Sequence, residues 1–382
     1  MKFGHLADCH LGGWRHPELQ KLNFDSFRYA LESCKKEKVD FILIAGDLFD
    51  SAYPPIETIK DTFEEFRKLK ETNIPVFLVA GSHDYSVSGK SFLDVLEKSG
   101  FATNVHKVQE KNGSIILEPT IHKNVAIYGF PGRKTGLEVY DLEKIKLQES
   151  PGLFRILMLH TTMKDALPGL DIPSVDPSKL PKVDYTALGH LHLVYEKEKR
   201  VYGGPIFPNN ASELEDLKYG AFYICSTSGE ISRRQIKLKE VIIIDFEITD
   251  SLSGTEKIIS KLNLLPLKDK IIILKLKGIL EKGKVTDIDF NKIERFVSSK
   301  GAYSFLKNTT KLIFPIADID IQPQNDNLEQ SIISKFIEDH PHRYNEIIVS
   351  MLNSLNLDKK EDELSRTFDD RLFSEVNKIL QI

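Results

Sequence analysis

Asp8-Cys9-His10-Leu11-Gly12, near the amino terminus, is the first of five short strings that decide the fold of this chain. The other four are Gly46-Asp47-Leu48-Phe49-Asp50, Gly81-Ser82-His83-Asp84, His160 and Gly189-His190-Leu191-His192. Each string follows a hydrophobic run, at residues 2–7, 41–45, 76–80, 154–159 and 185–188. Such runs predict buried strands. Side chains at the carboxyl ends of neighbouring strands meet at one edge of a sheet, so the strings predict one shared site.

The composition is that of an ordinary globular protein with more than one domain. A length of 382 residues predicts two or three domains. No apolar stretch approaches the roughly 20 residues of a membrane span, so we expect no membrane association. Met1-Lys2-Phe3 enters a strand directly and shows no secretory signal. Three cysteines without paired spacing favour a reducing, cytoplasmic location.

The first 240 residues predict two sheets with helices outside both. Strands and helices alternate up to about residue 100, with helices expected near 24–37, 57–72 and 89–98. Shorter strands follow up to about residue 240, interrupted by one helical stretch near 137–147. Two sheets packed face to face and covered by helices form a four-layer α/β sandwich, in the order αββα.

The rest of the chain predicts a smaller domain and a helical tail. Residues 241–322 alternate strands (240–248, 270–277) and helices (254–263, 288–299), which predicts an α+β capping domain. Residues 323–382 follow a polar hinge and predict helices alone. Basic residues outnumber acidic ones within 251–320, and the reverse holds for 321–382. This contrast suits a polyanion on the capping domain and another partner on the tail, although ordinary solvated surfaces explain it equally well.

The five strings together supply the side chains of a two-metal site. Mixed carboxylate and imidazole ligands suit Mn, Fe or Zn better than Mg or Ca. Two such ions can grip a phosphoryl oxygen and activate a water molecule. Asp47, after the most apolar strand, is the natural bridge, and His83, flanked by Asp84, fits a general acid.

Taken singly, several of these residues have simpler explanations. A lone histidine after an apolar strand, such as His160, is more often part of the core than a ligand. Cys9 lies between two ligands, but on a strand its side chain would point away from them into the core. Asp50 fits either a second layer around the metals or the cap of a turn. The order of all five strings, each at a strand end, favours the metal site.

These motifs resemble the calcineurin-like metallophosphoesterase superfamily, whose pattern is D-x-H, G-D, G-N-H-D/E, H and G-H-x-H. Within it, Gly46-Asp47-Leu48-Phe49-Asp50 is similar to the SbcD branch. This branch contains nucleases of DNA double-strand-break repair, including the archaeal meiotic-recombination-eleven type. The specific likeness covers about residues 1–225, and the domain order covers the rest.

The resemblance implies two Mn²⁺ ions per chain and assigns their ligands. One ion would be held by Asp8, His10, Asp47 and His192, and the other by Asp47, Ser82, His160 and His190. The catalytic pair would be His83, as general acid, and the adjoining Asp84. The chain departs from the family at Ser82, where asparagine is usual and the serine hydroxyl has a shorter reach. The second ion would therefore bind through a water molecule, bind weakly, or be retained by its other three ligands.

The resemblance also implies an activity and partners. The activity is two-metal, Mn²⁺-dependent hydrolysis of DNA: 3′-to-5′ exonuclease action on duplexes and endonuclease action on single strands. The partners are DNA, a second copy of the chain through helices 57–72 and 89–98, and a coiled-coil ABC-type ATPase of the SbcC kind. The ATPase would bind an apolar stripe on the last helix, formed by Leu372, Phe373, Val376, Ile379 and Leu380. That stripe could equally pack against the chain's own helices.

Two other functions fit the same fold. One is a small-molecule phosphodiesterase or protein phosphatase, although the capping domain and tail have no evident use for a small substrate. The other is a scaffold for the ATPase, in which Ser82 marks a weakened second metal site.

Overall fold

The computed structural model describes residues 1–85, 91–111, 113–170, 172–313, 333–334, 336–338, 342, 344–357 and 365–380. Contacts between Cα atoms divide the chain into two compact units, Met1–Leu312 and Ile313–Ile382. Each unit is described by itself below.

The first sheet of the larger unit has six strands in the order β15-β14-β1-β2-β3-β4. Strands β1 to β4 run parallel, and β14 and β15 add an antiparallel edge. The strands are β1 (Lys2–Leu6), β2 (Phe41–Ala45), β3 (Val76–Val79), β4 (Thr103–Asn104), β14 (Gly220–Ser226) and β15 (Ile231–Ile236). The four parallel strands all end at the same edge of the sheet.

The second sheet also has six strands, in the order β12-β13-β11-β10-β8-β7. They are β7 (Thr120–His122), β8 (Val125–Phe130), β10 (Phe154–His160), β11 (Tyr185–Gly189), β12 (Glu196–Lys197) and β13 (Arg200–Tyr202). A small sheet lies beside it, formed by β5 (Val108–Lys111), β6 (Ser114–Leu117) and β9 (Ile145–Leu147). Short 3-10 turns follow at Lys164–Ala166 and Pro177–Lys179.

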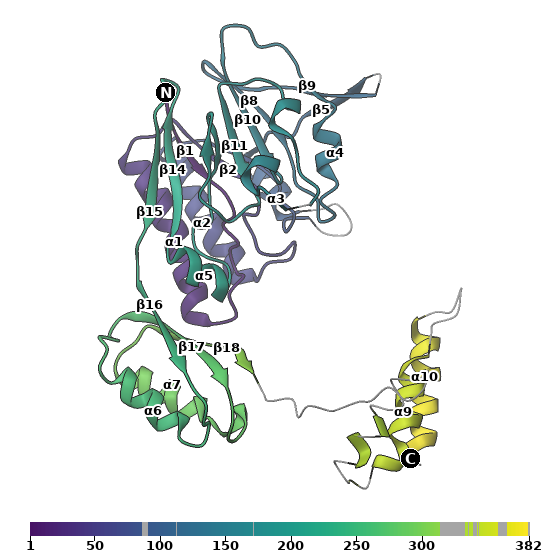
Figure 1. Ribbon diagram of the computed structural model, residues 1–382. Coiled ribbons are helices and arrows are strands. Elements are labelled where there is room, and N and C mark those ends of the chain that lie inside the picture. Colours follow the sequence, from purple (N-terminus) through teal and green to yellow (C-terminus); the bar gives the residue numbers. More distant parts are fainter. Residues whose placement is uncertain are drawn as a thin grey trace. The chain divides into compact units, whose positions relative to one another are not determined.

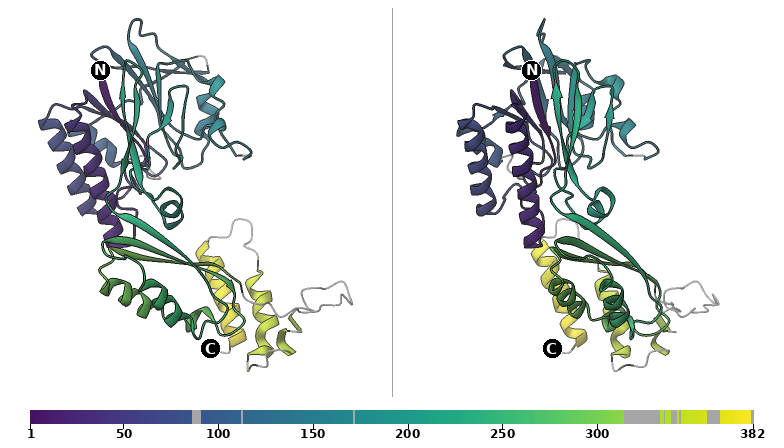
Figure 2. Two further views of the ribbon diagram at one scale, coloured as in Figure 1. Left: turned by 60° about the vertical axis from the view of Figure 1, so that its left-hand side comes forward. Right: turned by 90° about the vertical axis from the view of Figure 1, so that its left-hand side faces the viewer.

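Side chains that alternate along each strand pack one face of the first sheet against the second sheet and its other face against helices. In β2, Phe41 and Leu43 point into the core between the two sheets, whereas Ile42 and Ile44 point toward the helices. Those helices are α1 (Pro17–Lys36), α2 (Ile56–Glu71) and α3 (Phe92–Lys98). Helix α4 (Glu138–Leu142) covers the far face of the second sheet (Figures 1 and 2). The predicted four-layer αββα arrangement is confirmed.

The segment that was predicted to form a capping domain lies, up to Leu312, in the same compact unit as the sandwich and contains a three-stranded sheet. We keep the name capping domain for this segment. Its strands are β16 (Glu240–Glu247), β17 (Lys270–Ile279) and β18 (Ser304–Ile313), and we call them the capping sheet. Helices α6 (Gly254–Leu262) and α7 (Phe290–Ser299) cover one face, and a 3-10 turn spans Val285–Asp287. On the other face, Ile271 and Ile273 pack against Leu19 and Leu22 of α1. The capping domain is therefore joined to the sandwich by a core of its own.

Two segments differ from the sequence-based expectation. The helix expected near 137–147 is limited to α4, because residues 145–147 instead pair with β6 as a parallel strand. Strand β18 was not predicted at all. Its sequence, SFLKNTTKLI, is too polar in the middle to show a clear alternation of apolar and polar residues. The strand is stabilised by pairing with β17 more than by its own β propensity.

The smaller unit is helical where it is described. A 3-10 turn at Asn345–Ile347 leads into α9 (Ile348–Leu355), which contacts α10 (Ser365–Leu380). Residues 333–334 and 336–338 are also helical. The predicted boundary at residue 322 and the hinge around it lie outside the described residues. Among the helices that are described, none has the length and apolarity needed to cross a bilayer.

Candidate metal centre

The loops after five strands meet at one edge of the sandwich, as the sequence predicts. The loops after β1 and β2 are bound to one another, because the Asp8 N–H donates to the Gly46 carbonyl (3.1 Å) and the His10 N–H to that of Asp47 (3.0 Å). Four candidate ligands have positive φ: Asp8 (51°), His10 (43°), Asp47 (49°) and His190 (104°). Such backbone strain gathers at functional sites, where the surrounding fold enforces it.

Asp8, His10 and His192 form the first group of ligands. Their ligand atoms lie within 4.8 Å of one another. His10 Nδ1 donates to Asp50 Oδ1 (3.0 Å), and His192 Nδ1 donates to Glu213 Oε2 (2.9 Å). Each carboxylate thereby fixes the tautomer of its histidine and leaves a lone pair on Nε2. The two Nε2 atoms lie 3.1 Å apart, so a shared proton or a metal cation between them would satisfy both.

Asp8, Asp47 and His160 form the second group. His160 Nδ1 donates to the Ala45 carbonyl (3.0 Å), so Nε2 is the ring nitrogen that faces the site, 3.2 Å from Asp47 Oδ2. Within the described residues, His160 Nε2 and Asp8 Oδ2 are buried without a hydrogen-bond partner. Buried polar atoms normally have partners. These orphaned nitrogen and oxygen donors fit a divalent transition metal.

The electrostatics of the pocket favour a positive charge. Burial alone would lower the pKa of His160, but the carboxylates of Asp47 and Asp8 outweigh burial and raise the pKa to about 10. Burial and the neighbouring charge of His160 lower the pKa of His190 to about 4. His190 is therefore a neutral imidazole, the form that binds metals.

The predicted residues at positions 82 and 190 take part less directly. Ser82 Oγ donates to Asp47 Oδ2 at 3.4 Å, so Ser82 contacts the carboxylate that was predicted to bridge the two ions. The His190 ring packs edge-on against His160 with 5.1 Å between ring centroids, and its backbone N–H donates to Asp8 Oδ1. Among the described residues, the ring of His190 belongs to none of the three clustered ligand groups.

The predicted catalytic pair divides into an exposed and a buried member. The His83 side chain is 47% exposed, with its Nδ1 donating to the Asp50 carbonyl (2.7 Å). Together with His10 and Asp50 it forms the third ligand group. Asp84 is buried and accepts hydrogen bonds from the backbone N–H groups of Gly81, Leu48 and Phe49. Asp84 thus ties the loop after β3 to the loop after β2.

Two residues of the site were missed from the sequence. Glu213, on helix α5 (Ala211–Leu217), holds His192, and Asn209 Nδ2 donates to Asp50 Oδ1 (3.1 Å). Asn210 followed by Glu213 marks the start of a helix, but no spacing connects that helix with residue 192. Asp50, for which the sequence allowed a second layer around the metals or the cap of a turn, accepts a hydrogen bond from His10. Cys9 is in the core, as predicted. Its side chain is directed there by a loop in which Asp8 and His10 have positive φ, and not by a strand.

Glycine is required where the loop after β2 meets His160. Gly46 has φ +88°, and a Cβ there would lie 2.1 Å from His160 Nδ1. We expect Gly46→Ala to lower the free energy of unfolding by at least about 3 kcal/mol, from backbone strain and the clash together. Gly136→Ala is the control, because Gly136 has φ +67° with open space around it and should lose only about 1–2 kcal/mol. Equal losses in chemical denaturation would show that the contact with His160 has no effect.

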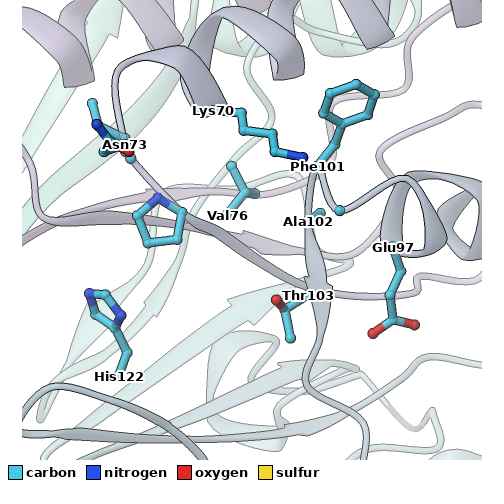
Figure 3. Close-up of a pocket in the computed structure, with 11 residues that line it drawn as sticks. Lys70, Asn73, Val76, Glu97, Phe101, Ala102, Thr103 and His122 are labelled. Atoms are coloured by element: carbon cyan, nitrogen blue, oxygen red, sulfur yellow. The ribbon is translucent and has the colours of Figure 1, made fainter.

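A second hollow lies at the opposite, amino-terminal edge of the strands. It has a volume of about 500 Å³ and is lined by the ends of α2, α3 and β7 and by residues before and within β3 and β4. Lys70, Phe101 and His122 are among them (Figure 3). The Lys70 ammonium lies over the Phe101 ring, and His122 packs on Phe41 and Phe77. No ligand of the metal centre lines this hollow.

Comparison with known proteins identifies the family of this chain. The family model of the calcineurin-like phosphoesterases matches residues 1–194. Several relatives carry the name DNA double-strand break repair protein Mre11. The one from Methanosarcina mazei is 30% identical over 78% of this chain and 48% of its own length. The one from Methanocaldococcus jannaschii is 26% identical over 93% of this chain and 94% of its own, and that from Sulfolobus acidocaldarius is 25% identical over 96% and 98%.

The share of each relative that the chain covers differs. The chain spans about half the length of the two Methanosarcina proteins that it matches. The family model covers half of the chain, and its range contains all five motif strings. The chain belongs to the calcineurin-like phosphoesterase family.

Proposed function

We propose that this protein is a Mn²⁺-dependent DNA nuclease of double-strand-break repair. The observation that carries the proposal is the pair of inward-facing Nε2 atoms of His10 and His192 beside the unpartnered Asp8 Oδ2. Such a donor set fits a metal cation, and the names of the relatives favour DNA as the substrate. The action expected is 3′-to-5′ on duplex ends and endonucleolytic on single strands, inside the cell.

The ligand assignment follows from the groups described above. Asp8, His10, Asp47 and His192 would hold one Mn²⁺, and Asp47, Ser82, His160 and His190 would hold the second. When bound, the two ions supply positive charge for a phosphoryl oxygen and lower the pKa of a water molecule.

His83 is the proposed general acid that protonates the leaving oxygen. Its Nδ1 is engaged with the Asp50 carbonyl, so Nε2 is the atom left to hold a proton for the departing oxygen. The His83 backbone N–H donates to Asp47 Oδ1 at 2.8 Å, which fixes the distance between this acid and the bridging carboxylate. Asp84 contributes by holding both loops in place.

The substrate assignment is tested by comparing two phosphodiesters. We expect purified protein with Mn²⁺ to release nucleotides from the 3′ ends of duplex DNA, with a kcat/KM well above that for bis(p-nitrophenyl) phosphate. Chelation by EDTA should stop both reactions. Hydrolysis of the small ester without hydrolysis of DNA would favour the small-molecule phosphodiesterase. Loss of both reactions in the presence of Mn²⁺ would favour the scaffold.

Position 82 gives a prediction about the second ion. Replacing Ser82 by asparagine adds a carbonyl oxygen on a longer arm beside Asp47, which Ser82 now contacts at 3.4 Å. We expect Ser82→Asn to tighten binding of the weaker Mn²⁺ by about ten-fold, since even a residue that only supports a metal ligand typically changes affinity by about 10- to 100-fold. Isothermal titration with Mn²⁺ measures this effect, with Ser91→Asn, at the cap of α3, as the control. An unchanged second affinity would remove Ser82 from the ligand set.

The proposed partners are a second copy of the chain and a coiled-coil ATPase of the SbcC kind. For the homodimer, Tyr53 and Ile56 are 73% and 79% exposed next to a hollow of about 560 Å³ that reaches Val95 of α3. For the ATPase, Phe373 of the apolar stripe on α10 is 65% exposed although α10 contacts α9.

Phe373 is the residue whose change should separate the ATPase from the nuclease. Phe373→Glu places a charge on the exposed apolar stripe, and we expect it to abolish co-purification of the ATPase while DNA hydrolysis persists. Lys378→Glu, on the same helix but outside the stripe, is the control. Retained co-purification of the Phe373 variant would contradict this assignment of the tail.

A further inference from the structure

Helix α5 lies between the metal centre and the capping sheet and contacts both. It is a short helix, Ala211–Leu217, whose first turn is held by the Asn210 side chain accepting from the Glu213 N–H (3.0 Å). None of the five motif strings includes it. Its two central glutamates face different parts of the protein.

On the side of the metal centre, Glu213 is fixed from three directions. Its Oε2 accepts from His192 Nδ1 (2.9 Å) and from the Asn209 N–H (2.8 Å), and its Oε1 accepts from Asn210 Nδ2 (2.6 Å). A carboxylate in this position sets both the orientation and the basicity of the imidazole.

On the side of the capping sheet, Glu215 is fixed by two strands. Its Oε2 pairs with Lys275 Nζ of β17 (2.5 Å), and its Oε1 accepts from Asn308 Nδ2 of β18 (3.2 Å). The Glu215 side chain is only 10% exposed. Beside it, Leu214 is completely buried in the core that contains Ile271 and Leu306 of the same two strands. The helix is thus anchored in the capping sheet by a salt bridge, a hydrogen bond and apolar packing.

The helix itself transmits position from one side to the other. Residues 213 and 215 are two apart, and about 100° per residue places their side chains on nearly opposite sides of the helix. A shift of the capping sheet would move Glu215 and Leu214, and with them Glu213 and the imidazole of His192. We propose that Glu213 and Glu215 are positioning residues through which the capping sheet sets the metal affinity of His192. This inference rests on the proposed metal centre.

The test uses two lysines of the same strand. Lys275 of β17 pairs with Glu215, whereas Lys270 of β17 pairs with Glu240 within the capping sheet, also at 2.5 Å and with similar exposure (22% and 25%). Isothermal titration of the full chain with Mn²⁺ alone measures affinity without any turnover. We expect Lys275→Met to weaken Mn²⁺ binding by about three- to ten-fold, Lys270→Met to leave it within about two-fold, and Lys275→Arg to restore it.

A double variant separates positioning from general destabilisation. Glu213→Gln alone should weaken Mn²⁺ binding by at least about ten-fold. Once Glu213 no longer holds His192, adding Lys275→Met should cause no further loss. The proposal would be overturned if the double variant lost Mn²⁺ affinity by the product of the two single losses. It would also be overturned if Lys275→Met and Lys270→Met had equal effects. Absence of Mn²⁺ binding by the natural chain would instead show that the metal centre itself is wrong, and thermal unfolding of each variant confirms that it is folded.

Discussion

Asp47→Asn is expected to lower Mn²⁺-dependent DNA hydrolysis by at least about 10³-fold, because it acts on both proposed ions at once. Asp47 Oδ2 lies 3.2 Å from His160 Nε2 and 3.7 Å from His10 Nε2, so it faces both ligand groups. Asparagine is chosen because it tolerates the positive φ of this position, 49°, better than alanine does. The loss therefore reports charge and ligation, with little added backbone strain.

Asp40→Asn is the matched control for this change. Asp40 precedes β2 at the opposite edge of the sheet, where it accepts from the Lys2 N–H and pairs with Lys123. Its removal should leave hydrolysis within about two-fold, because surface ion pairs contribute little. Initial rates on a 3′-labelled duplex compare the two variants. Asp47→Asn activity within ten-fold of the natural chain would be incompatible with a bridging role.

His83→Ala is expected to lower DNA hydrolysis by about 10²–10⁴-fold, the usual contribution of a general acid. Mn²⁺ affinity should change little, since the His83 side chain is exposed and its Nδ1 is already bound to the Asp50 carbonyl. The combination of lost turnover with retained metal is what distinguishes an acid from a ligand.

The matched control for His83 is His16→Ala, which removes an exposed imidazole before α1 that makes no capping hydrogen bond. Metal titration and single-turnover hydrolysis should be run on both variants. A parallel fall in Mn²⁺ affinity and activity of the His83 variant would make His83 a metal ligand, and unchanged turnover would remove it from the mechanism.

The sequence predicts those parts of the site that depend on local pattern. Apolar runs such as 41–45 predict buried strands because continuous hydrophobicity of that length has few alternatives. Parallel strands end at one edge, so ligands placed just after them meet. That reasoning predicts that five ligands lie at one site: Asp8, His10, Asp47, His160 and His192.

The parts that could not be predicted depend on contacts between distant segments. Glu213 reaches His192 only because helix α5 folds back over the loop after β11, and neither residue shows this in its neighbours. Strand β18 forms because β17 is available to pair with it. The left-handed backbone at Asp8 and His10 could likewise not be predicted from the sequence, because hydrogen bonds to the neighbouring loop impose it.

Anomalous diffraction from a crystal soaked in Mn²⁺ tests the central claim most directly. The account predicts two peaks: a strong one bounded by Asp8, His10 and His192, and a weaker one bounded by Asp47 and His160, where Ser82 offers only a short hydroxyl arm. An absence of peaks at these side chains, in a crystal that holds Mn²⁺ elsewhere, would contradict the metal centre and the nuclease mechanism with it.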